Sequence, residues 1–233
     1  MPRIAVVGDF DPDNPTHTAT SDALGHSATA LGVAVDVSWV PTDELGEADD
    51  PGSALAPFDA VFVAPGSPYR SMAGALAAIE HARRRPLPLI GTCGGFQHVV
   101  IEFARNVMRL PDVRHAECDP YASSLIITPL SCSLVGQALE VSIEAGTRAG
   151  KAYGTDRATE QYYCNFGLNP DYIDDLVGAG LAVSGTDTDG EVRIVELADH
   201  PFFVGTLFVP QARSTLVRPH PLVTAFVEAA GTG

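Results

Sequence analysis

The chain has 233 residues, of which 45% are hydrophobic and 18% charged, a composition typical of a well-packed globular protein. Its formal net charge of -15 disfavours binding to the phosphate backbone of nucleic acids and to anionic lipid surfaces. The largest basic cluster, residues 83–85, is followed by Pro86, and we interpret it as cations at the negative end of a helix dipole. We therefore expect neither nucleic acid nor a membrane as a partner.

The N-terminal sequence and the hydropathy pattern indicate where the protein is found. Met1-Pro2-Arg3 leads directly into the apolar residues 4–7, without the basic and apolar regions of a signal peptide. No apolar stretch approaches the roughly 20 residues that are needed to cross a bilayer. We expect a cytoplasmic protein.

The cysteines are too widely spaced for a known metal-binding or disulfide framework. Cys93, Cys118, Cys132 and Cys164 include no CxxC pair and no ligand-like spacing to histidine. We predict four reduced thiols, no metal site and no cofactor. The spacing leaves open whether Cys118 or Cys164 meets Cys93 in space, a pairing that would direct the site toward redox chemistry.

The first half of the chain alternates short β-branched runs with helical patterns. We predict strands at residues 4–7, 33–40, 60–64 and 87–91, and helices at about 18–31, at 72–84 and after Gly95. Residues 42–57 are rich in Asp, Glu, Gly and Pro and are predicted to form a solvated loop. Such alternation is typical of parallel strands joined by crossover helices. It predicts an α/β fold in three layers, with a doubly wound, mostly parallel sheet.

The second half is dominated by patterns typical of strands. We predict strands at residues 125–128, 139–143, 181–184, 192–197 and 202–208, and a final helix at 220–230. Asp189-Gly190 is a hairpin signal between two of these strands. The second half therefore adds an antiparallel element to the sheet. Because no internal repeat and no linker is visible, we expect a single domain over residues 1–233.

The segment most indicative of chemistry is Gly91-Thr92-Cys93-Gly94-Gly95, between a predicted buried strand and a helix. This is the placement of the nucleophile elbow of hydrolases, a strained turn that exposes its central residue. The glycines leave room for the strand and the helix to pass closely. A helix N-terminus behind the sulfur favours the reactive thiolate. The alternative is an inert cysteine in a tight turn.

The sequence around this turn resembles a known family. Ile90-Gly91-Thr92-Cys93-Gly94-Gly95-Phe96-Gln97 and residues 100–107 are similar to the nucleophile region of the C-terminal glutaminase domain of CTP synthase, a class I glutamine amidotransferase. Further similar segments lie at residues 64–67, 181–185, 189–190, 195–197, 200–205, 218–222 and 226–230. The resemblance covers nearly the whole chain and implies a flavodoxin-like core. The chain also resembles stand-alone proteins related to this region, some of them selenoproteins, which implies that chalcogen nucleophile chemistry can persist outside amidotransfer.

The resemblance implies roles for several residues. Cys93 would form the acyl intermediate, and the backbone N–H groups of Ser67 and Gly94 would form the oxyanion hole. The candidates for substrate binding are Gly66, Gln97, Glu117 and Gln161. The carboxylate of Glu117 can pair with a substrate ammonium group. Without the resemblance, Glu117 would be interpreted as an ordinary exposed acid in a loop.

The sequence departs from the family at three points. Val209 and Gln211 stand where the family has the histidine base and the glutamate that orients it, and neither can replace its counterpart in proton transfer. Gln161 occupies the position at which the family has an arginine that binds the substrate carboxylate. The chain also lacks the phosphate-binding loop of a synthetase domain, so we expect that it does not make CTP alone.

Another residue could replace the missing base. Asp9, Asp11 and His17 follow the first predicted strand, at the sheet edge where ligands of α/β folds collect. His115 lies two residues before Glu117. Each is also readily interpreted as a turn aspartate or a surface histidine. His98, five residues after Cys93 on a helix, should point away from it.

Three hypotheses for function follow. We favour a cysteine-dependent hydrolase or transferase acting on a small amide, nitrile-like or amino-acid-derived substrate. The second hypothesis is an inactive binding or regulatory pseudoenzyme. The third is a glutaminase subunit that needs a separate synthetase partner. A homo-oligomer is compatible with each of them.

Overall fold

A computed structural model describes residues 1–232 and contains a nine-stranded mixed sheet in the order β2-β1-β3-β4-β12-β11-β10-β7-β8. The five strands from β2 to β12 are parallel, and the pairs from β12 to β8 are antiparallel. The predicted doubly wound sheet with an antiparallel element is thereby confirmed. The strand bounds are β1 (Arg3–Val7), β2 (Asp36–Val40), β3 (Ala60–Val63), β4 (Leu89–Thr92), β7 (Ala138–Ile143), β8 (Arg157–Gln161), β10 (Ala182–Thr186), β11 (Val192–Glu196) and β12 (Phe203–Thr206).

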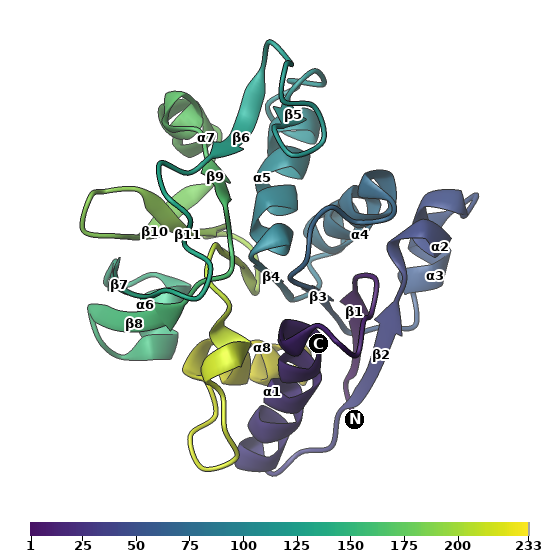
Figure 1. Ribbon diagram of the computed structural model, residues 1–233. Helices are drawn as coiled ribbons and strands as arrows, with labels where there is room; N and C mark the ends of the chain where they lie inside the picture. The colour runs from purple at the N-terminus through teal and green to yellow at the C-terminus, as the bar shows by residue number, and fades with distance from the viewer. Residues whose placement is uncertain (233) are drawn as a thin grey trace.

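Helices cover both faces of the parallel part of the sheet. Helices α1 and α8 pack together on one face, and α4 and α5 pack together on the other (Figure 1). Strands β3 and β4 are fully buried between these layers, as expected for parallel strands that have no solvent-facing side. The helix bounds are α1 (Pro15–Leu31), α2 (Thr42–Glu47), α3 (Pro51–Leu55), α4 (Met72–Arg84), α5 (Gly94–Asn106), α6 (Arg148–Tyr153), α7 (Ile173–Gly178) and α8 (Pro221–Ala230).

A second, three-stranded sheet packs beside α5. It has the order β5-β6-β9, with β5 (Arg114–His115), β6 (Leu125–Pro129) and β9 (Phe166–Leu168). Strands β6 and β9 both contact α5. Two short 3-10 helices, η1 (Pro170–Tyr172) and η2 (Pro210–Arg213), complete the elements. The sequence did not predict β5, β8, β9, α6 or α7, because these short elements lack a clear hydrophobic period.

The prediction of a solvated loop over residues 42–57 was wrong. The segment forms α2 and α3, and its apolar residues Leu45 and Leu55 are buried. Both helices begin with residues that favour a helix N-terminus, and the overall composition of the segment does not reveal them. Asp43 and Glu44 lie in the first turn of α2, and Pro51 begins α3 after the capping side chain of Asp50.

The arginine cluster has a more specific role than the predicted one. Arg83 and Arg84 do lie in the last turn of α4. In addition, the Arg83 guanidinium donates to both carboxylate oxygens of Glu102, with the shortest distance 2.6 Å. Glu102 is fully buried on α5, so this bidentate pair joins the two helices.

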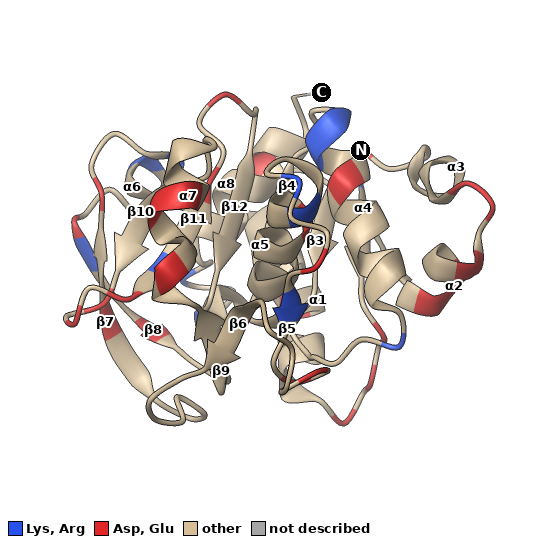
Figure 2. Cartoon of the chain, turned by 90° about the horizontal axis from the view of Figure 1, so that it is seen from above, with Lys and Arg blue, Asp and Glu red and all other residues tan. Residues whose placement is uncertain are grey.

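Acidic residues occur along the ribbon in both halves of the molecule, with fewer basic residues between them (Figure 2). Several of the cations are paired with these acids, as in the contact of 2.7 Å between Arg157 and Glu140. None of the helices within residues 1–232 is both long and apolar enough for a membrane span.

The start of α5 approaches the sheet so closely that only glycine fits. A Cβ built on Gly95 would overlap the backbone carbonyl of Val63 in β3. A Cβ on Gly91 would lie 2.9 Å from the carbonyl oxygen of Gly95. The contact is between backbone atoms, which cannot move aside as a side chain can. The two glycines therefore set how near the helix N-terminus lies to β3 and β4.

Gly95→Ala is expected to lower the free energy of unfolding by about 1–3 kcal/mol or more, because the added methyl group has no space. The matched control is Gly25→Ala in the middle of α1, where an added Cβ would meet no atom within 4 Å. That variant should be neutral or more stable by about 0.5–1 kcal/mol. Urea unfolding of both variants measures the difference, and equal stabilities would contradict the packing argument.

Candidate active site

Cys93 occupies the turn between β4 and α5 in a backbone conformation that side chains rarely adopt. Its φ is 53° and its ψ is -106°. Such a conformation costs on the order of 1–3 kcal/mol and persists only where the surroundings enforce it. The Cys93 N–H donates to the carbonyl of Thr206 in β12 at 2.8 Å, and its carbonyl accepts from the N–H of Gln97 at 3.2 Å. Cys93 therefore lies in a strained strand-to-helix turn, with its sulfur at the N-terminus of a 13-residue helix.

The loop after β3 lies against the first residue of α5. Gly66 in this loop has a φ of 104°. A Cβ built on Gly94 would lie 3.2 Å from the carbonyl carbon of Gly66 and 3.3 Å from the Cβ of Ser67. As the first residue of a helix, Gly94 has an N–H that finds no acceptor within the helix. Ser67 and Gly94 are thus neighbours beside Cys93.

A cavity of about 290 Å³ opens at this turn. Its lining includes five predicted site residues, namely Gly66, Ser67, Cys93, Gln97 and Glu117. Pro65, residues 14–16 at the start of α1, and residues 163–166 complete the wall. Sequence reasoning missed the first of these segments, although its position after β1 could have indicated it, and raised Cys164 of the second only as one of two cysteines that could meet Cys93. Gln161 does not line the cavity.

Gln97 is held in place by three groups. Its Oε1 accepts from the Nε2–H of His115 at 3.1 Å and from the Ser67 hydroxyl at 3.4 Å. Its Nε2 donates to the carbonyl of Phe166 at 3.0 Å. The side-chain amide therefore joins the loop after β3 to the small sheet, and its orientation is fixed by the protein.

Glu117 has a carboxylate oxygen without a partner. Its backbone N–H donates to the Nδ1 of His115 at 3.0 Å, which positions the residue at the cavity wall. Its Oε2 is buried, and within residues 1–232 no hydrogen-bond donor reaches it. A buried anionic oxygen without a donor calls for an explanation, and a cationic ligand in the cavity would supply one.

The candidate bases after the first strand are engaged in other contacts, and the Asp11 carboxylate accepts the N–H of Asp13 at 2.9 Å. His17 accepts the N–H of Asp11 at its Nδ1, and its Nε2–H donates to the carbonyl of Pro65 at 2.9 Å. Asp9 accepts from Thr42 and from the backbone of Arg70. In the described chain no hydrogen bond joins the Cys93 sulfur to a histidine or a carboxylate.

His98 and His115 are buried as neutral rings. The Nδ1–H of His98 donates to the carbonyl of Gly94 at 2.8 Å, and the two nitrogens of His115 are used by Gln97 and Glu117. Burial lowers the pKa of each histidine to about 4. Each ring therefore acts near neutral pH as a fixed connector at the site.

The side chains of Val209 and Gln211 have structural contacts: Val209 is packed in the interior, and Gln211 makes hydrogen bonds to neutral groups. Both side chains are buried. The Val209 N–H donates to the carbonyl of Gln161 at 2.8 Å. The Gln211 amide donates to the hydroxyls of Thr20 and Thr92 at 3.1 and 3.0 Å, which ties η2 to α1 and to the end of β4. Neither side chain can accept a proton from a thiol.

Cys93 and Cys164 form a disulfide, with their Cα atoms 6.2 Å apart. This separation lies in the usual range for the bond. Cys118 and Cys132 are free and exposed. The expectation of four reduced thiols was therefore wrong for two of them. The two residues are 71 positions apart, and only the folding of residues 163–166 over the turn brings them together.

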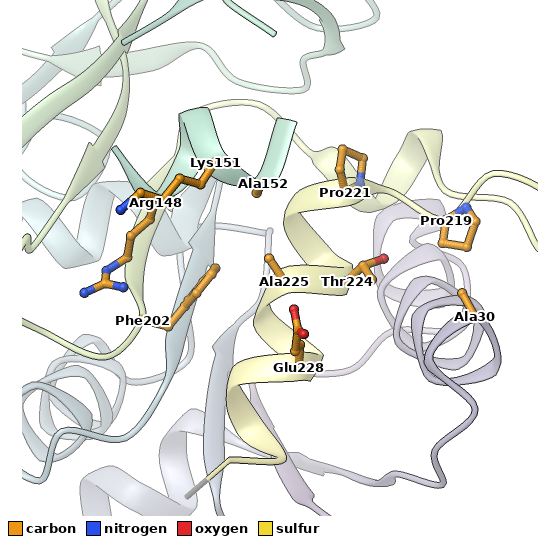
Figure 3. Close-up of a pocket in the computed structure, with 10 residues that line it drawn as sticks. All are labelled: Ala30, Arg148, Lys151, Ala152, Phe202, Pro219, Pro221, Thr224, Ala225 and Glu228. Atoms are coloured by element: carbon orange, nitrogen blue, oxygen red, sulfur yellow. The ribbon is translucent and has the colours of Figure 1, made fainter. Parts of the chain in front are cut away.

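A separate depression of about 550 Å³ lies on another part of the surface, between α1, α6 and α8. Figure 3 shows Arg148 and Lys151 of α6 on one side of it and Thr224 and Glu228 of α8 on the other. None of the predicted site residues lines it. No group of His, Cys, Asp and Glu in residues 1–232 could hold a metal ion.

Comparison with known proteins identifies the class. The family model for glutamine amidotransferase class-I matches residues 17–229, so the chain belongs to the class I glutamine amidotransferase family. Within that family it is similar to CTP synthase. It is 33% identical over 97% of its length to CTP synthase of Herpetosiphon aurantiacus and 35% identical over 97% to that of Acidobacterium capsulatum. The chain spans 44% and 43% of the length of these relatives.

Solved structures agree with this assignment. The glutaminase domain of Trypanosoma brucei CTPS with bound acivicin matches with a TM-score of 0.91 and 29% identity, over 99% of this chain and 94% of that one. A glutamine amidotransferase from Thermotoga maritima matches with a TM-score of 0.57 and 12% identity, over 90% and 76% of the two chains, and shows the shared fold alone. The expected resemblance and fold are confirmed.

Two of the buried histidines, His98 and His115, predict how stability depends on pH. Below pH 6.5 the unfolded chain protonates both rings, whereas the folded chain resists protonation until about pH 4. The free energy of unfolding should therefore fall as the pH drops from 6.5 to 4, by at most about 3 kcal/mol per histidine. His98→Gln should reduce this slope, as measured by urea unfolding at a series of pH values. The matched control is His26→Gln, because His26 is a half-buried histidine on α1. An unchanged slope in the His98 variant would contradict the assignment.

Proposed function

We propose that the reduced chain is a cysteine-dependent hydrolase or transferase that acts on a small, amino-acid-derived amide or nitrile-like substrate and is no ordinary glutaminase. The observation that carries this proposal is the strained turn of Cys93 at the N-terminus of α5, facing a cavity. A protein gains no stability from such a turn, so a chemical use of the sulfur that lines the cavity is its natural explanation.

The first chemical step needs a thiolate and a place for negative charge. The positive end of the helix dipole lowers the free energy of the Cys93 thiolate. As the thiolate attacks an electrophilic carbon, the developing oxyanion would accept hydrogen bonds from the N–H groups of Ser67 and Gly94. Donors fixed in advance in this way commonly contribute about 3–4 kcal/mol of transition-state stabilisation.

The cavity favours a substrate with a positive charge. Glu117 offers a buried carboxylate oxygen that has no donor. Among the described residues that line the cavity there is neither lysine nor arginine, and Gln161 lies outside it. An ammonium group would thus be bound by charge, whereas a free carboxylate would find no cation. We infer that the substrate carries an ammonium group and that its carboxylate, if present, is not the anchor that it is in the family.

The second chemical step would differ from that of a glutaminase. We interpret Val209 and Gln211 as degenerate triad positions, because a valine and a neutral amide cannot move protons. Release of an acyl intermediate would then depend on water or on an acceptor that brings its own base. This favours slow hydrolysis or transfer to an incoming nucleophile.

Two alternatives keep specific support. The loss of proton-transferring groups at Val209 and Gln211 is compatible with a binding or regulatory pseudoenzyme. The similarity to CTP synthase, of which the chain spans less than half, is compatible with a glutaminase subunit that works with a separate synthetase partner. Reactivity of Cys93 distinguishes the first alternative, and ammonia release on mixing with a synthetase would identify the second.

The alkylation rate of Cys93 by iodoacetamide should follow an apparent pKa well below the usual value of about 8.5, because the helix N-terminus favours the thiolate. The chain is first reduced, and each thiol is then read by peptide mass spectrometry against pH. The exposed Cys118 and Cys132 are internal controls. A normal or raised pKa for Cys93 would indicate an idle thiol and a binding module.

Glu117→Gln should slow the labelling of Cys93 by acivicin about 10–100-fold at low reagent concentration, because a charge-assisted contact to the ammonium group is lost. Acivicin is an electrophilic amino acid, whereas iodoacetamide carries no ammonium group, so alkylation by iodoacetamide should change little. Glu47→Gln, an exposed acid at the end of α2, is the matched control. Equal slowing by both reagents would mean that Glu117 supports the structure and not the ligand.

A further inference from the structure

The pairing of Cys93 with Cys164 places a second sulfur at the candidate nucleophile. Cys93 is 7% exposed and Cys164 is 3% exposed, and both line the cavity. Cys164 belongs to the segment that covers the turn, between β8 and β9. While the disulfide persists, the Cys93 sulfur cannot attack a carbon atom. The same two residues can instead exchange a disulfide with a small molecule that enters the cavity.

We propose that Cys93 and Cys164 form a redox-active dithiol that reduces small cationic disulfides by thiol–disulfide exchange, with Cys93 as the attacking thiol and Cys164 as the resolving thiol. The proposal shares the reactive Cys93 thiolate with the proposed function and does not require an acyl intermediate. Its substrate class is a disulfide RSSR whose R groups carry ammonium.

Both steps of this exchange balance without a further co-reactant. The Cys93 thiolate attacks one sulfur of RSSR, the S–S bond breaks, and RS⁻ leaves and takes a proton from solvent. The Cys164 thiol then loses its proton to solvent and attacks the Cys93 sulfur of the mixed disulfide, which displaces the second RS⁻. Two protein thiols are oxidised by two electrons, and RSSR is reduced to two RSH. A dithiol reductant in solution reverses the protein step.

The site suits exchange better than hydrolysis in one respect. Exchange requires a thiolate and a nearby second thiol, and it requires no group that protonates a leaving amine or activates water. The structure supplies the first two. For the third, no hydrogen bond in the described chain joins a histidine or a carboxylate to the Cys93 sulfur, and His17 and His115 use both ring nitrogens in other contacts.

The surroundings of Cys164 favour the resolving role. Its sulfur lies 3.0 Å from the carbonyl oxygen of Leu207, which can accept a hydrogen bond from the thiol in the reduced state. This contact disfavours the Cys164 thiolate relative to that of Cys93, which lies at a helix N-terminus. Cys93 is therefore the sulfur that attacks first, and Cys164 reacts once the mixed disulfide is adjacent to it.

The cavity limits the substrate by size and by charge. A volume of about 290 Å³ admits a small disulfide rather than a peptide. The donor-free oxygen of Glu117 and the formal net charge of -15 both favour a cation. Cystamine, a small disulfide with two ammonium groups, has these properties. Hydroxyethyl disulfide has a comparable size and no charge, so it is the matched neutral probe.

The test uses the full chain with Cys118 and Cys132 changed to Ser, because those exposed thiols would react independently. The chain is reduced, freed of reductant and mixed with cystamine. Acid quenching and peptide mass spectrometry then follow the products. The expected result is a peptide pair linked through Cys93 and Cys164, with two cysteamine molecules released per chain. Reaction with hydroxyethyl disulfide should be slower, and Glu117→Gln should reduce that difference to the part set by the acidity of the two leaving thiols.

Adding Cys164→Ala should stop the reaction at a stable mixed disulfide on Cys93, with one cysteamine released per chain. Cys164→Ser serves as a second variant with a similar shape, and circular dichroism verifies that both are folded. If the parent chain also stops at a stable adduct, or if Cys93 does not react with cystamine, the proposal is wrong.

The outcomes separate this proposal from the proposed function. If acivicin and iodoacetamide label Cys93 selectively but no linked peptide forms, the exchange proposal falls and the proposed function stands. If the linked peptide forms but acivicin does not label Cys93, the proposed function falls and the exchange proposal stands. If Cys93 reacts with none of these reagents, both fall.

Discussion

The close contact between the start of α5 and the sheet is the constraint on which the site depends. Gly95 allows the helix backbone to reach the carbonyl of Val63, and Gly91 allows β4 to end directly beneath it. A chain that leaves β4 and enters a helix in so little space must turn sharply, and Cys93 takes up that turn with a φ of 53°. The position of the sulfur, its nearness to the loop at Gly66 and its place at the helix N-terminus all follow from this contact.

Around this turn, polar side chains serve rigidity more than proton transfer. Gln97 is held by His115 and Phe166, and His98 is held by Gly94. These contacts fix the walls of the cavity. They also occupy histidine nitrogens that could otherwise have acted as bases. Sulfur chemistry tolerates this arrangement better than amide hydrolysis does, because a thiolate is both a good nucleophile and a good leaving group. The fold of an amidotransferase can in this way support a different use of its cysteine.

Long periodic elements and the turn motif were predictable from the sequence. The helix over residues 72–84 has the bounds that its pattern predicts, and the glycines around Cys93, between a predicted strand and a helix, indicate the tight turn that the structure shows. Residues 42–57 show the limit of composition, because buried positions such as Leu45 are visible only when the partner helix α4 is in place. Cys164 shows a second limit. Its distance from Cys93 is set by the antiparallel half of the chain, whose short strands carry little period of their own.

The disulfide also changes the connectivity of the chain. It closes residues 93–164 into a covalent ring that contains α5, the β5-β6 part of the small sheet and the β7-β8 edge of the large one. A ring of this size restricts the unfolded chain by about 4 kcal/mol in the chain-entropy model. The oxidised form should therefore resist proteases and heat better than the reduced form. The form with a blocked sulfur should then be the more durable one, so the lifetime of the protein should depend on the redox state of its surroundings.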